Sequence, residues 1–474
     1  MEDSMTQPAA QQAELHEPLP GRWRILGFLG VAQLMLILDV TVVAIALPHM
    51  ETDLALSREA LTWTVSAYTL TFGGLMLLGG RITDLLGAKR IVIAGLLLFT
   101  VASLVTGLAG TAAMLLAGRV AQGVGAALLS PAALSLVVAL FDGEERNKAL
   151  GVWSALGGGG AALGVLLGGL LTAGPGWSWV FHINVPIGLV IAVVLAVLLP
   201  ARTPSAASRP RLDVLGAILV TSASASLIYA LIAAGEKGWL SALTGWLVLA
   251  AAVGYVLFVL WQRWARSPLM DVRLLARRPV AVGAFLILMA TALMIAVFFL
   301  GTFYFQHALG YGALQAGLLF LPVALATMLG ANLTGRLLGR WGGRALAVAG
   351  LTVAAIGMAV PAFSTNVVSV VAGVAVAAAG TGAMFVIASA TALGQVAPHE
   401  AGIASGIVST FHEFGASIGA AVISSVAAAS LAGTTLHGFT SGFTVAAIAS
   451  AVGAVIAALV TPGRPSPTGQ AGSQ

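Results

Sequence analysis

The chain carries one short polar motif twice, as Gly80-Arg81-Ile82-Thr83-Asp84-Leu85-Leu86-Gly87-Ala88-Lys89 and as Gly335-Arg336-Leu337-Leu338-Gly339-Arg340-Trp341-Gly342-Gly343-Arg344. The two copies align without a gap, and a glycine, an arginine, a second glycine and a terminal basic residue coincide. Each copy follows a long apolar run. A motif that recurs in the same setting indicates an internal repeat, so we expect two equivalent halves.

Long apolar runs surround both copies of the motif, with charged residues clustered between the runs. Fourteen of these runs are candidate membrane-spanning helices. They cover residues 24–48, 61–80, 91–109, 112–140, 149–172, 182–200, 214–234, 243–262, 279–302, 314–334, 345–363, 367–394, 402–430 and 441–462.

The composition of the 474 residues excludes a soluble fold. Hydrophobic residues make up 59% of the chain and charged residues 8%, whereas a soluble domain carries roughly 25% charged residues. Continuous apolar runs also argue against an outer-membrane β-barrel, whose strands alternate apolar and polar residues. The chain has no cysteine, which excludes a disulfide framework and a thiolate metal site. The sequence therefore predicts an all-α polytopic membrane protein with 14 transmembrane helices, without a metal or cofactor.

The basic residues indicate which ends of the helices face the cytoplasm. An even number of spans places both termini on one side, and cytoplasmic loops are enriched in lysine and arginine. Arg58 and Lys237 fall on one face, and Arg119 lies inside a span. The other nineteen share the opposite face: Arg22, Arg24, Arg81, Lys89, Arg90, Arg146, Lys148, Arg202, Arg209, Arg211, Arg263, Arg266, Arg273, Arg277, Arg278, Arg336, Arg340, Arg344 and Arg464. We predict cytoplasmic termini, and a basic excess that reflects topology and not nucleic-acid binding.

The repeat and the spans together predict the domain organisation. Residues 23–200 form an N-terminal six-helix bundle, and residues 279–462 form a C-terminal one. Residues 201–278 are a linker that includes two inserted helices. Residues 1–22 and 463–474 are expected to be cytoplasmic tails, the second disordered. Two parallel six-helix repeats are typical of an alternating-access transporter.

Asp39 and Arg119 are two of the few charged residues inside the predicted spans. A charge in hydrocarbon costs at least about 2.5–3.5 kcal/mol, so such residues indicate function. At 1.5 Å per residue, Asp39 lies roughly 13 Å and Arg119 roughly 10 Å below the outer surface. They could therefore pair directly or through water. The alternative is a buried strut that holds spans 1 and 4 together.

Glu413 lies close to the predicted bilayer midplane, with His412 beside it in the sequence. A carboxyl at this depth could take up and release a proton when access switches sides. The alternative is a permanently protonated Glu413 that donates to a backbone carbonyl. Adjacent helical residues point about 100° apart, so His412 need not join it.

Uncharged polar and aromatic residues supply weaker candidates for a substrate cavity. Together with His412 they are Gln33, Thr41, Trp63, Tyr68, Gln122, Phe303 and Asn332.

Glycines are dense in two predicted spans, 149–172 and 402–430. Small residues four apart let helices approach closely, so we assign Gly160, Gly164, Gly168 and Gly169 to helix packing. The motif GxxxxGK[ST] is absent, so the chain encodes no ATP-binding loop of that kind.

Several of these segments resemble the major facilitator superfamily, and specifically its fourteen-span drug:proton antiporter family. The stretches 38–48, 119–126 and 177–188 resemble its signatures in span 1, in span 4 and at the entry to span 6. The loop 80–90 resembles the gating loop of the superfamily. The resemblance implies a cytoplasmic gate in which Asp84 and the basic residues form a charge relay. The gate residues are Gly80, Arg81, Asp84, Gly87, Lys89 and Arg90. It also implies that Arg119 takes part in proton transfer.

Four positions depart from the family pattern. Ala44 stands where the family usually has asparagine, and Val165 replaces the proline of the span 5 antiporter motif. His412 and Glu413 occupy a stretch where many relatives have Arg-Gln. Glu413 is therefore supported by its depth in the membrane more than by the family pattern.

We predict a proton-coupled exporter of amphipathic drug-like or antibiotic compounds in the bacterial inner membrane, and not an enzyme. Asp39, Arg119 and Glu413 would couple transport to protons. The expected partners are a small-molecule substrate, protons and the lipid bilayer, with no nucleic acid, and the protein is expected to be a monomer. The alternatives are a proton symporter that imports a small metabolite and a membrane receptor or scaffold without transport.

Overall fold

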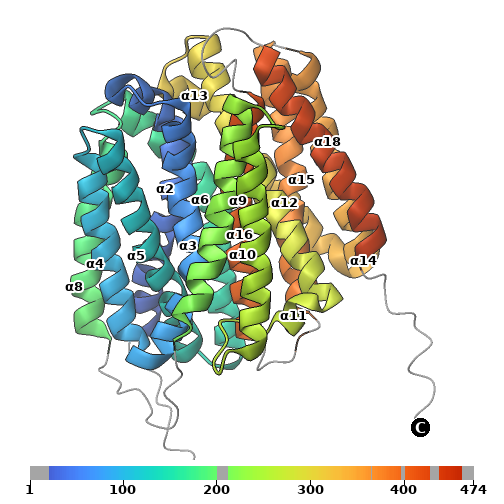
Figure 1. Cartoon of the computed structure of the whole chain (residues 1–474). Coiled ribbons are helices and arrows are strands. Elements are labelled where there is room, and N and C mark those ends of the chain that lie inside the picture. Colours follow the sequence, from blue (N-terminus) through green and yellow to red (C-terminus); the bar gives the residue numbers. More distant parts are fainter. Residues whose placement is uncertain are drawn as a thin grey trace, which may run out of the picture.

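A computed structural model describes residues 21–199, 212–364, 366–394, 396, 401–427 and 437–461. The described chain is a bundle of long helices (Figure 1). The predicted tails 1–22 and 463–474 and the start of the linker fall largely or wholly outside these residues, as do Arg202, Arg209, Arg211 and Arg464. The elements are α2 (Arg22–Leu54), α3 (Arg58–Leu86), α4 (Ala88–Gly107), α5 (Ala112–Leu140), α6 (Gly143–Ala173), α7 (Trp179–His182), α8 (Asn184–Leu198), α9 (Val214–Lys237), α10 (Ala242–Trp264), α11 (Val272–Ala276), α12 (Arg278–Phe303), the π-helical turn η1 (Tyr304–Ala308), α13 (Ala313–Leu319), α14 (Leu321–Phe363), α15 (Val367–Leu393), α16 (Ala401–Val426) and α18 (His437–Val460).

Within the described residues, twelve helices are long and apolar enough to cross a membrane. The predicted all-helical membrane fold is therefore confirmed. Two predicted spans, 314–334 and 345–363, fall in one continuous stretch, Ala313–Phe363. The predicted span 149–172 lies in α6, whose apolar described part, Leu163–Ala173, is shorter than the other twelve helices.

The repeated motif adopts the same backbone conformation in both copies. Gly87, between α3 and α4, has φ 89° and ψ 136°. Gly342, the aligned glycine of the second copy, has φ 78° and ψ 158° inside α14. Side chains disfavour this region strongly, so only glycine adopts it at low cost. At Gly342 the helical conformation is therefore broken, and α14 consists of two helical segments that meet at this residue. The aligned glycines of the two copies therefore both have positive φ.

The helix contacts follow the repeat as well. In the first half α2 packs against α6 and α4 against α5, and in the second half α12 packs against α16 and α14 against α15. Glycines allow the close approach of the first and third pairs. A Cβ atom added at Gly164 would lie 1.8 Å from Thr41 Oγ1, and one at Gly415 would lie 2.5 Å from the Leu288 carbonyl oxygen. The packing that we expected of the glycines in these two spans is present.

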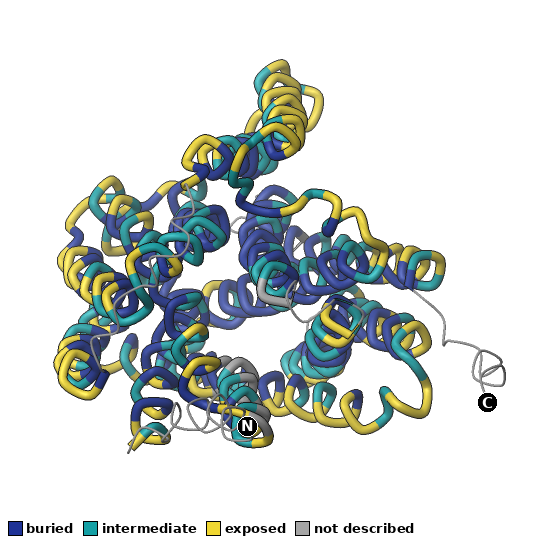
Figure 2. The backbone as a smooth tube through the Cα atoms, turned by 90° about the horizontal axis from the view of Figure 1, so that it is seen from below, coloured by how far each residue is buried: buried dark blue, intermediate teal, exposed yellow. Residues whose placement is uncertain are grey.

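The inserted helices lie at the seam between the two halves. α9 packs against both α3 and α16, whereas α10 packs mainly against α9. Thr221 of α9 lies against Gly74 of α3, and Gly235 of α9 lies against Ser425 of α16. Figure 2 shows a mostly exposed helical pair at the rim of the bundle, consistent with the low burial of α10. α9 therefore bridges the two halves, and α10 forms the outside of the insert.

The two ends of the bundle differ in charge. One end, which we call the basic end, carries Arg81, Lys89 and Arg90 at the α3–α4 turn and Arg273 on α11. It is the lower end in Figure 1. The opposite end carries α13 and the C-terminal end of α2.

Gly79 provides a test of the close contact between α3 and α5. A Cβ atom at this position would lie 2.0 Å from the Ala127 carbonyl oxygen, which belongs to a helix backbone and cannot move alone. We expect Gly79→Ala to destabilise the protein by roughly 1–3 kcal/mol, the usual cost of overpacking. The melting temperature of the purified protein in detergent measures this loss.

Gly245 on α10 serves as the control, because nothing lies within 4 Å of a Cβ atom built there. Gly245→Ala should raise the stability by roughly 0.5–1 kcal/mol, since alanine is the better helix former. Equal melting temperatures for the two variants would contradict the α3–α5 packing.

Candidate functional site

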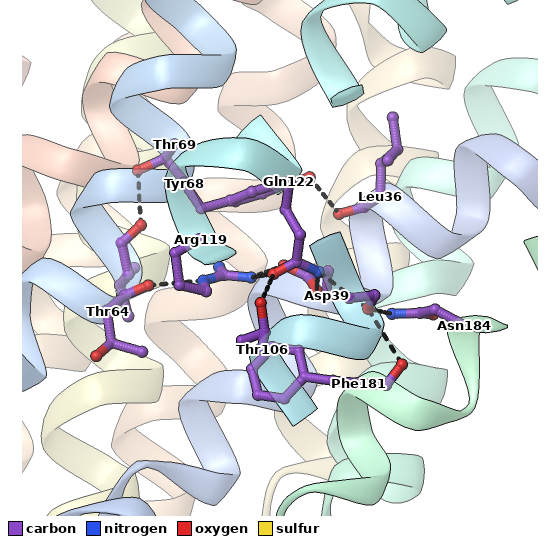
Figure 3. Close-up of polar contacts among 12 residues, drawn as sticks. Leu36, Asp39, Thr64, Tyr68, Thr69, Thr106, Arg119, Gln122, Phe181 and Asn184 are labelled. Atoms are coloured by element: carbon purple, nitrogen blue, oxygen red, sulfur yellow. Dashed lines mark hydrogen bonds and ion pairs between the residues drawn. The ribbon is translucent and has the colours of Figure 1, made fainter. Parts of the chain in front are cut away.

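Asp39 and Arg119 form a buried ion pair inside the first half (Figure 3). Asp39 lies on α2 and Arg119 on α5, and both side chains are fully buried. Arg119 Nη1 donates to Asp39 Oδ2. The pairing that the sequence suggested is therefore present as a direct contact. Two charges buried this deeply require partners, because the desolvation of each ion costs several kcal/mol.

Gln122 ties the pair together from one turn further along α5. Its Nε2 donates to Asp39 Oδ1 at 3.0 Å, and its Oε1 accepts from Arg119 Nη1 at 3.0 Å. The sequence suggested a place in the substrate cavity for Gln122. The structure instead shows it fully buried, as a bridge between the two charges.

Arg119 has further partners on α3. Its Nε donates to the Thr64 carbonyl oxygen at 2.8 Å, and its guanidinium carbon lies 4.4 Å from the centre of the Tyr68 ring. Its Nη2 has no partner among the described residues. Tyr68, which was a cavity candidate, therefore holds Arg119 through a cation–π contact. Nη2 can therefore donate a further hydrogen bond to an acceptor atom.

A polar chain extends the cluster towards α7 and α8. Gln122 Nε2 donates to Ser103 Oγ at 3.1 Å, and Asn184 Nδ2 donates to the same oxygen at 3.0 Å. Ser103 Oγ in turn donates to the Phe181 carbonyl oxygen at 3.1 Å. Sequence reasoning missed Ser103. Asn184 falls within the 177–188 stretch, whose resemblance could have indicated it.

Asp39 is the one carboxyl group among the side chains of this cluster that the structure describes. Neutralising Asp39 would remove the charge that holds Arg119 Nη1, while Gln122 and Thr64 would still keep Arg119 in place. The cluster includes residues of α2, α3, α4, α5 and α8. Such a change would therefore alter hydrogen bonds between several helices of the first half. The arrangement also fits a buried strut, since Asp39 is sealed from solvent in this structure.

Glu413 lies at the seam between the halves. Its side chain on α16 is 9% exposed, and a Cβ atom on Gly73 of α3 would lie 2.7 Å from its Cβ. His412 Nδ1 lies 3.1 Å from Glu413 Oε1. His412 therefore contacts Glu413, although helical geometry alone does not require these neighbours to meet. The side chains bend towards each other although their Cα–Cβ bonds diverge.

The remaining cavity candidates are scattered. Trp63 lies 6.4 Å from the Tyr229 ring of α9 and so packs on the insert. Phe303 is fully buried among aromatic residues. Thr41 donates to the Leu38 carbonyl oxygen within its own helix. Gln33 is half-buried and Asn332 is exposed. The structure does not bring these five residues together.

The predicted charge relay at the basic end is not assembled in this structure. Asp84 is exposed and makes no ion pair within the described ranges. Lys89 Nζ donates instead to the carbonyl oxygens of Ala196, at 2.8 Å, and Leu199. These groups lie at the end of α8, where helix carbonyls lack partners. Arg81 Nη2 donates to the Pro268 carbonyl oxygen at 3.3 Å. Both basic residues are therefore engaged away from Asp84.

The opposite end is closed by contacts between the halves. Gln306 Nε2 donates to the Ile45 carbonyl oxygen at 2.9 Å. Thr62 Oγ1 donates to Ser424 Oγ at 2.5 Å. A Cβ atom at Gly169 would lie 2.8 Å from the Ala313 carbonyl oxygen, so α6 and α13 touch through their backbones. The two halves are thus sealed together at the end that lacks the basic cluster.

Comparison with known proteins identifies the family. The sequence pattern of the Major Facilitator Superfamily matches residues 29–420 and 286–474. The chain belongs to the major facilitator superfamily. It is therefore a transporter, and the predicted multi-pass location in the bacterial inner membrane is confirmed.

Relatives of this superfamily member refine the comparison. It is 38% identical to the puromycin resistance protein of Streptomyces alboniger over 89% of this chain and 85% of that protein. It is 34% identical to the cephamycin export protein of Amycolatopsis lactamdurans, over 85% and 84% of the two chains. The predicted resemblance to the drug:proton antiporter family is confirmed by such relatives.

A solved structure shares the fold of the superfamily. A bacterial homologue of the human lysosomal transporter Spinster, in an inward-facing and occupied conformation, matches with a TM-score of 0.64. The match covers 94% of this chain and 97% of that chain at 16% sequence identity. At this identity the similarity concerns the fold alone.

Proposed function

We propose that this protein exports amphipathic, drug-like compounds from the cytoplasm in exchange for protons. The relatives that are named for puromycin resistance and cephamycin export support export of this class of compound. The buried Asp39–Arg119 pair supports proton coupling, because an ionisable carboxyl in the membrane interior is costly unless it acts.

The proposed topology has fourteen spans with both termini in the cytoplasm. The bundles are residues 23–200 and 279–462, and the linker 201–278 carries α9 and α10. In this topology the basic end faces the cytoplasm, in agreement with the enrichment of lysine and arginine there. The closed opposite end then faces outwards, and the free Asp84 belongs to an inward-facing state in which the cytoplasmic gate is open.

The transport cycle follows from these two sites. Protons from outside would neutralise Asp39 and Glu413 in the outward-facing state, and substrate would leave. Return to the inward-facing state would release the protons to the cytoplasm and allow Asp39 to pair again with Arg119. The protonation of Glu413 would respond to the contact between the two halves, because Glu413 on α16 lies against Gly73 of α3.

A drug-susceptibility panel in an efflux-deficient bacterial host tests this function. Cells with the wild-type protein should survive higher concentrations of some amphipathic antibiotics than cells with an empty vector. A protonophore should remove the export of a fluorescent substrate. Uptake of the substrate down the proton gradient would instead identify a symporter.

Glu413→Gln tests the coupling to protons in the same experiment. The glutamine keeps the shape of the side chain but cannot release a proton, so we expect weaker resistance and a flatter dependence of export on external pH. His412→Gln is the matched control, because it changes the neighbouring residue and leaves the carboxyl intact. Export by Glu413→Gln at the wild-type rate and pH dependence would exclude a coupling role.

A further inference from the structure

A cavity of about 890 Å³ lies between the inserted helices and the second half. α10 forms one wall, α16 the facing wall, and α11 with the chain before it closes the basic end. It is separate from the Asp39 cluster, which lies entirely within the first half. Nothing in the proposed cycle uses this cavity.

The end of the cavity near α11 is positively charged. Arg263 of α10 and Arg273 of α11 line it, both are exposed, and neither forms an ion pair among the residues that the structure describes. Asp271 also lines this end. Its Oδ1, however, accepts the backbone N–H of Arg273 at 2.8 Å, and it caps α11. Among the described residues, neither guanidinium group is therefore paired with Asp271, and arginine outnumbers aspartate at this end.

The deeper part of the cavity is apolar and holds one unsatisfied hydroxyl. Phe258, Phe411, Phe414 and Ile418 line it. Thr410 also lines it, is 3% exposed, and its Oγ1 has no partner among the described residues. A buried hydroxyl without a hydrogen bond is costly, so an acceptor or donor from a ligand is favoured beside it.

The other polar side chains of the lining are already occupied. Gln262 Nε2 donates to Asp213 Oδ2 at 2.6 Å, and its Oε1 accepts from the Met270 N–H at 3.3 Å. The Tyr255 hydroxyl lies 2.8 Å from Ser224 Oγ. The groups available to a ligand are therefore Arg263, Arg273 and Thr410.

We propose that this cavity binds an anionic phospholipid of the cytoplasmic leaflet. Its phosphate would lie between Arg263 and Arg273, its ester oxygens would reach Thr410, and an acyl chain would fill the apolar part. Basic pockets between transmembrane helices on the cytoplasmic side attract anionic headgroups in this way. Residues 263–278 carry five arginines and one aspartate, so the charge of the site is complementary to that of the lipid.

The bound lipid would complete the packing of the insert. α10 packs mainly on α9, and α16 forms the far wall of the cavity. A lipid between them would therefore join the insert to the helix that carries Glu413. This inference does not depend on which compound the protein transports.

Lipid retention by the purified full-length protein tests the site. The protein is placed in nanodiscs of phosphatidylcholine with a small fraction of phosphatidylglycerol, extracted, and analysed by native mass spectrometry. We expect one phosphatidylglycerol molecule to remain bound to the wild type. Arg263→Gln combined with Arg273→Gln should lower its retention about thirtyfold, since each arginine near the surface contributes about 1 kcal/mol and 1.4 kcal/mol corresponds to a factor of about ten.

Arg266→Gln is the matched control, because Arg266 lies in the same segment but does not line the cavity. It should retain the lipid. Val259→Trp would fill the cavity from the exposed side of α10 and should exclude the lipid with both arginines in place. A photoreactive phosphatidylglycerol should label α10 and α16 in the wild type and in Arg266→Gln, but not in the double arginine variant or in Val259→Trp.

Three outcomes would overturn the proposal. Equal retention of phosphatidylcholine would remove the requirement for an anionic headgroup. Unchanged retention in the double arginine variant would place the lipid elsewhere. Displacement of the photoreactive lipid by a transported drug at transport concentrations would make the cavity part of the substrate path.

Discussion

Asp39→Asn is expected to abolish pH-driven efflux while the protein still folds. Asparagine has the shape of aspartate, and its amide oxygen can still accept from Arg119 or Gln122. It cannot take up and release a proton. Efflux from proteoliposomes with an imposed pH gradient should therefore fall to the level of empty vesicles, and size-exclusion chromatography should still show a folded protein.

The loss of a proton-carrying group in Asp39→Asn must be distinguished from the loss of a structural ion pair. Removing one partner of a buried pair costs roughly 3–5 kcal/mol when it leaves an uncompensated charge. Asp39→Asn combined with Arg119→Gln removes both charges. A strut predicts that this double variant regains both stability and transport, whereas a proton carrier predicts that it regains only stability.

Asp53→Asn is the control on the same helix. Asp53 Oδ2 accepts from Trp177 Nε1 at 2.8 Å at the end opposite the basic end, and asparagine preserves this hydrogen bond. Its efflux should equal that of the wild type. Wild-type efflux by Asp39→Asn would remove Asp39 from the coupling mechanism.

Thr62→Cys combined with Ser424→Cys is expected to lock the transporter. The two hydroxyl oxygens lie 2.5 Å apart and belong to different halves, so cysteines at these positions should form a disulfide under mild oxidation. The natural chain has no cysteine, which leaves no other thiol to react. A cross-link at this end should hold the inward-facing state and stop transport until a reductant is added.

Ser241→Cys combined with Thr244→Cys controls for the chemistry of oxidation. Their oxygens lie 2.8 Å apart within the first turn of α10, so the cross-link does not join the halves. Oxidation of this pair should leave transport unchanged. Reversible inhibition of the first pair alone supports alternating access, whereas transport by the fully cross-linked first pair would refute it.

Much of the fold could be predicted because hydrophobicity and a repeated motif are local properties of the sequence. The motif at residues 80–89 and its second copy predicted two equivalent halves, and Gly87 and Gly342 show the same positive φ. The structure also breaks between the predicted spans 314–334 and 345–363, because Gly342 interrupts the helical conformation of α14 there.

The candidate site could be predicted only in part. Asp39 and Arg119 were recognisable since a charge inside an apolar run is rare, and their depths in the membrane agreed. The role of Gln122 as a bridge and the contribution of Ser103 depend on side-chain packing between α4 and α5, which no spacing along the chain encodes. The carbonyl partners of Lys89 and Arg81, in place of Asp84, likewise depend on tertiary packing that the spacing does not encode.

The position of α9 places a mechanical demand on every turnover. Thr221 touches α3 near Gly74, and Gly235 touches α16 near Ser425, so one rigid rod is fastened to two bodies that must rotate against each other. At least one of these two contacts must change when the halves rotate. In each transport cycle, α9 must therefore slide over either α3 or α16 and move together with the other helix.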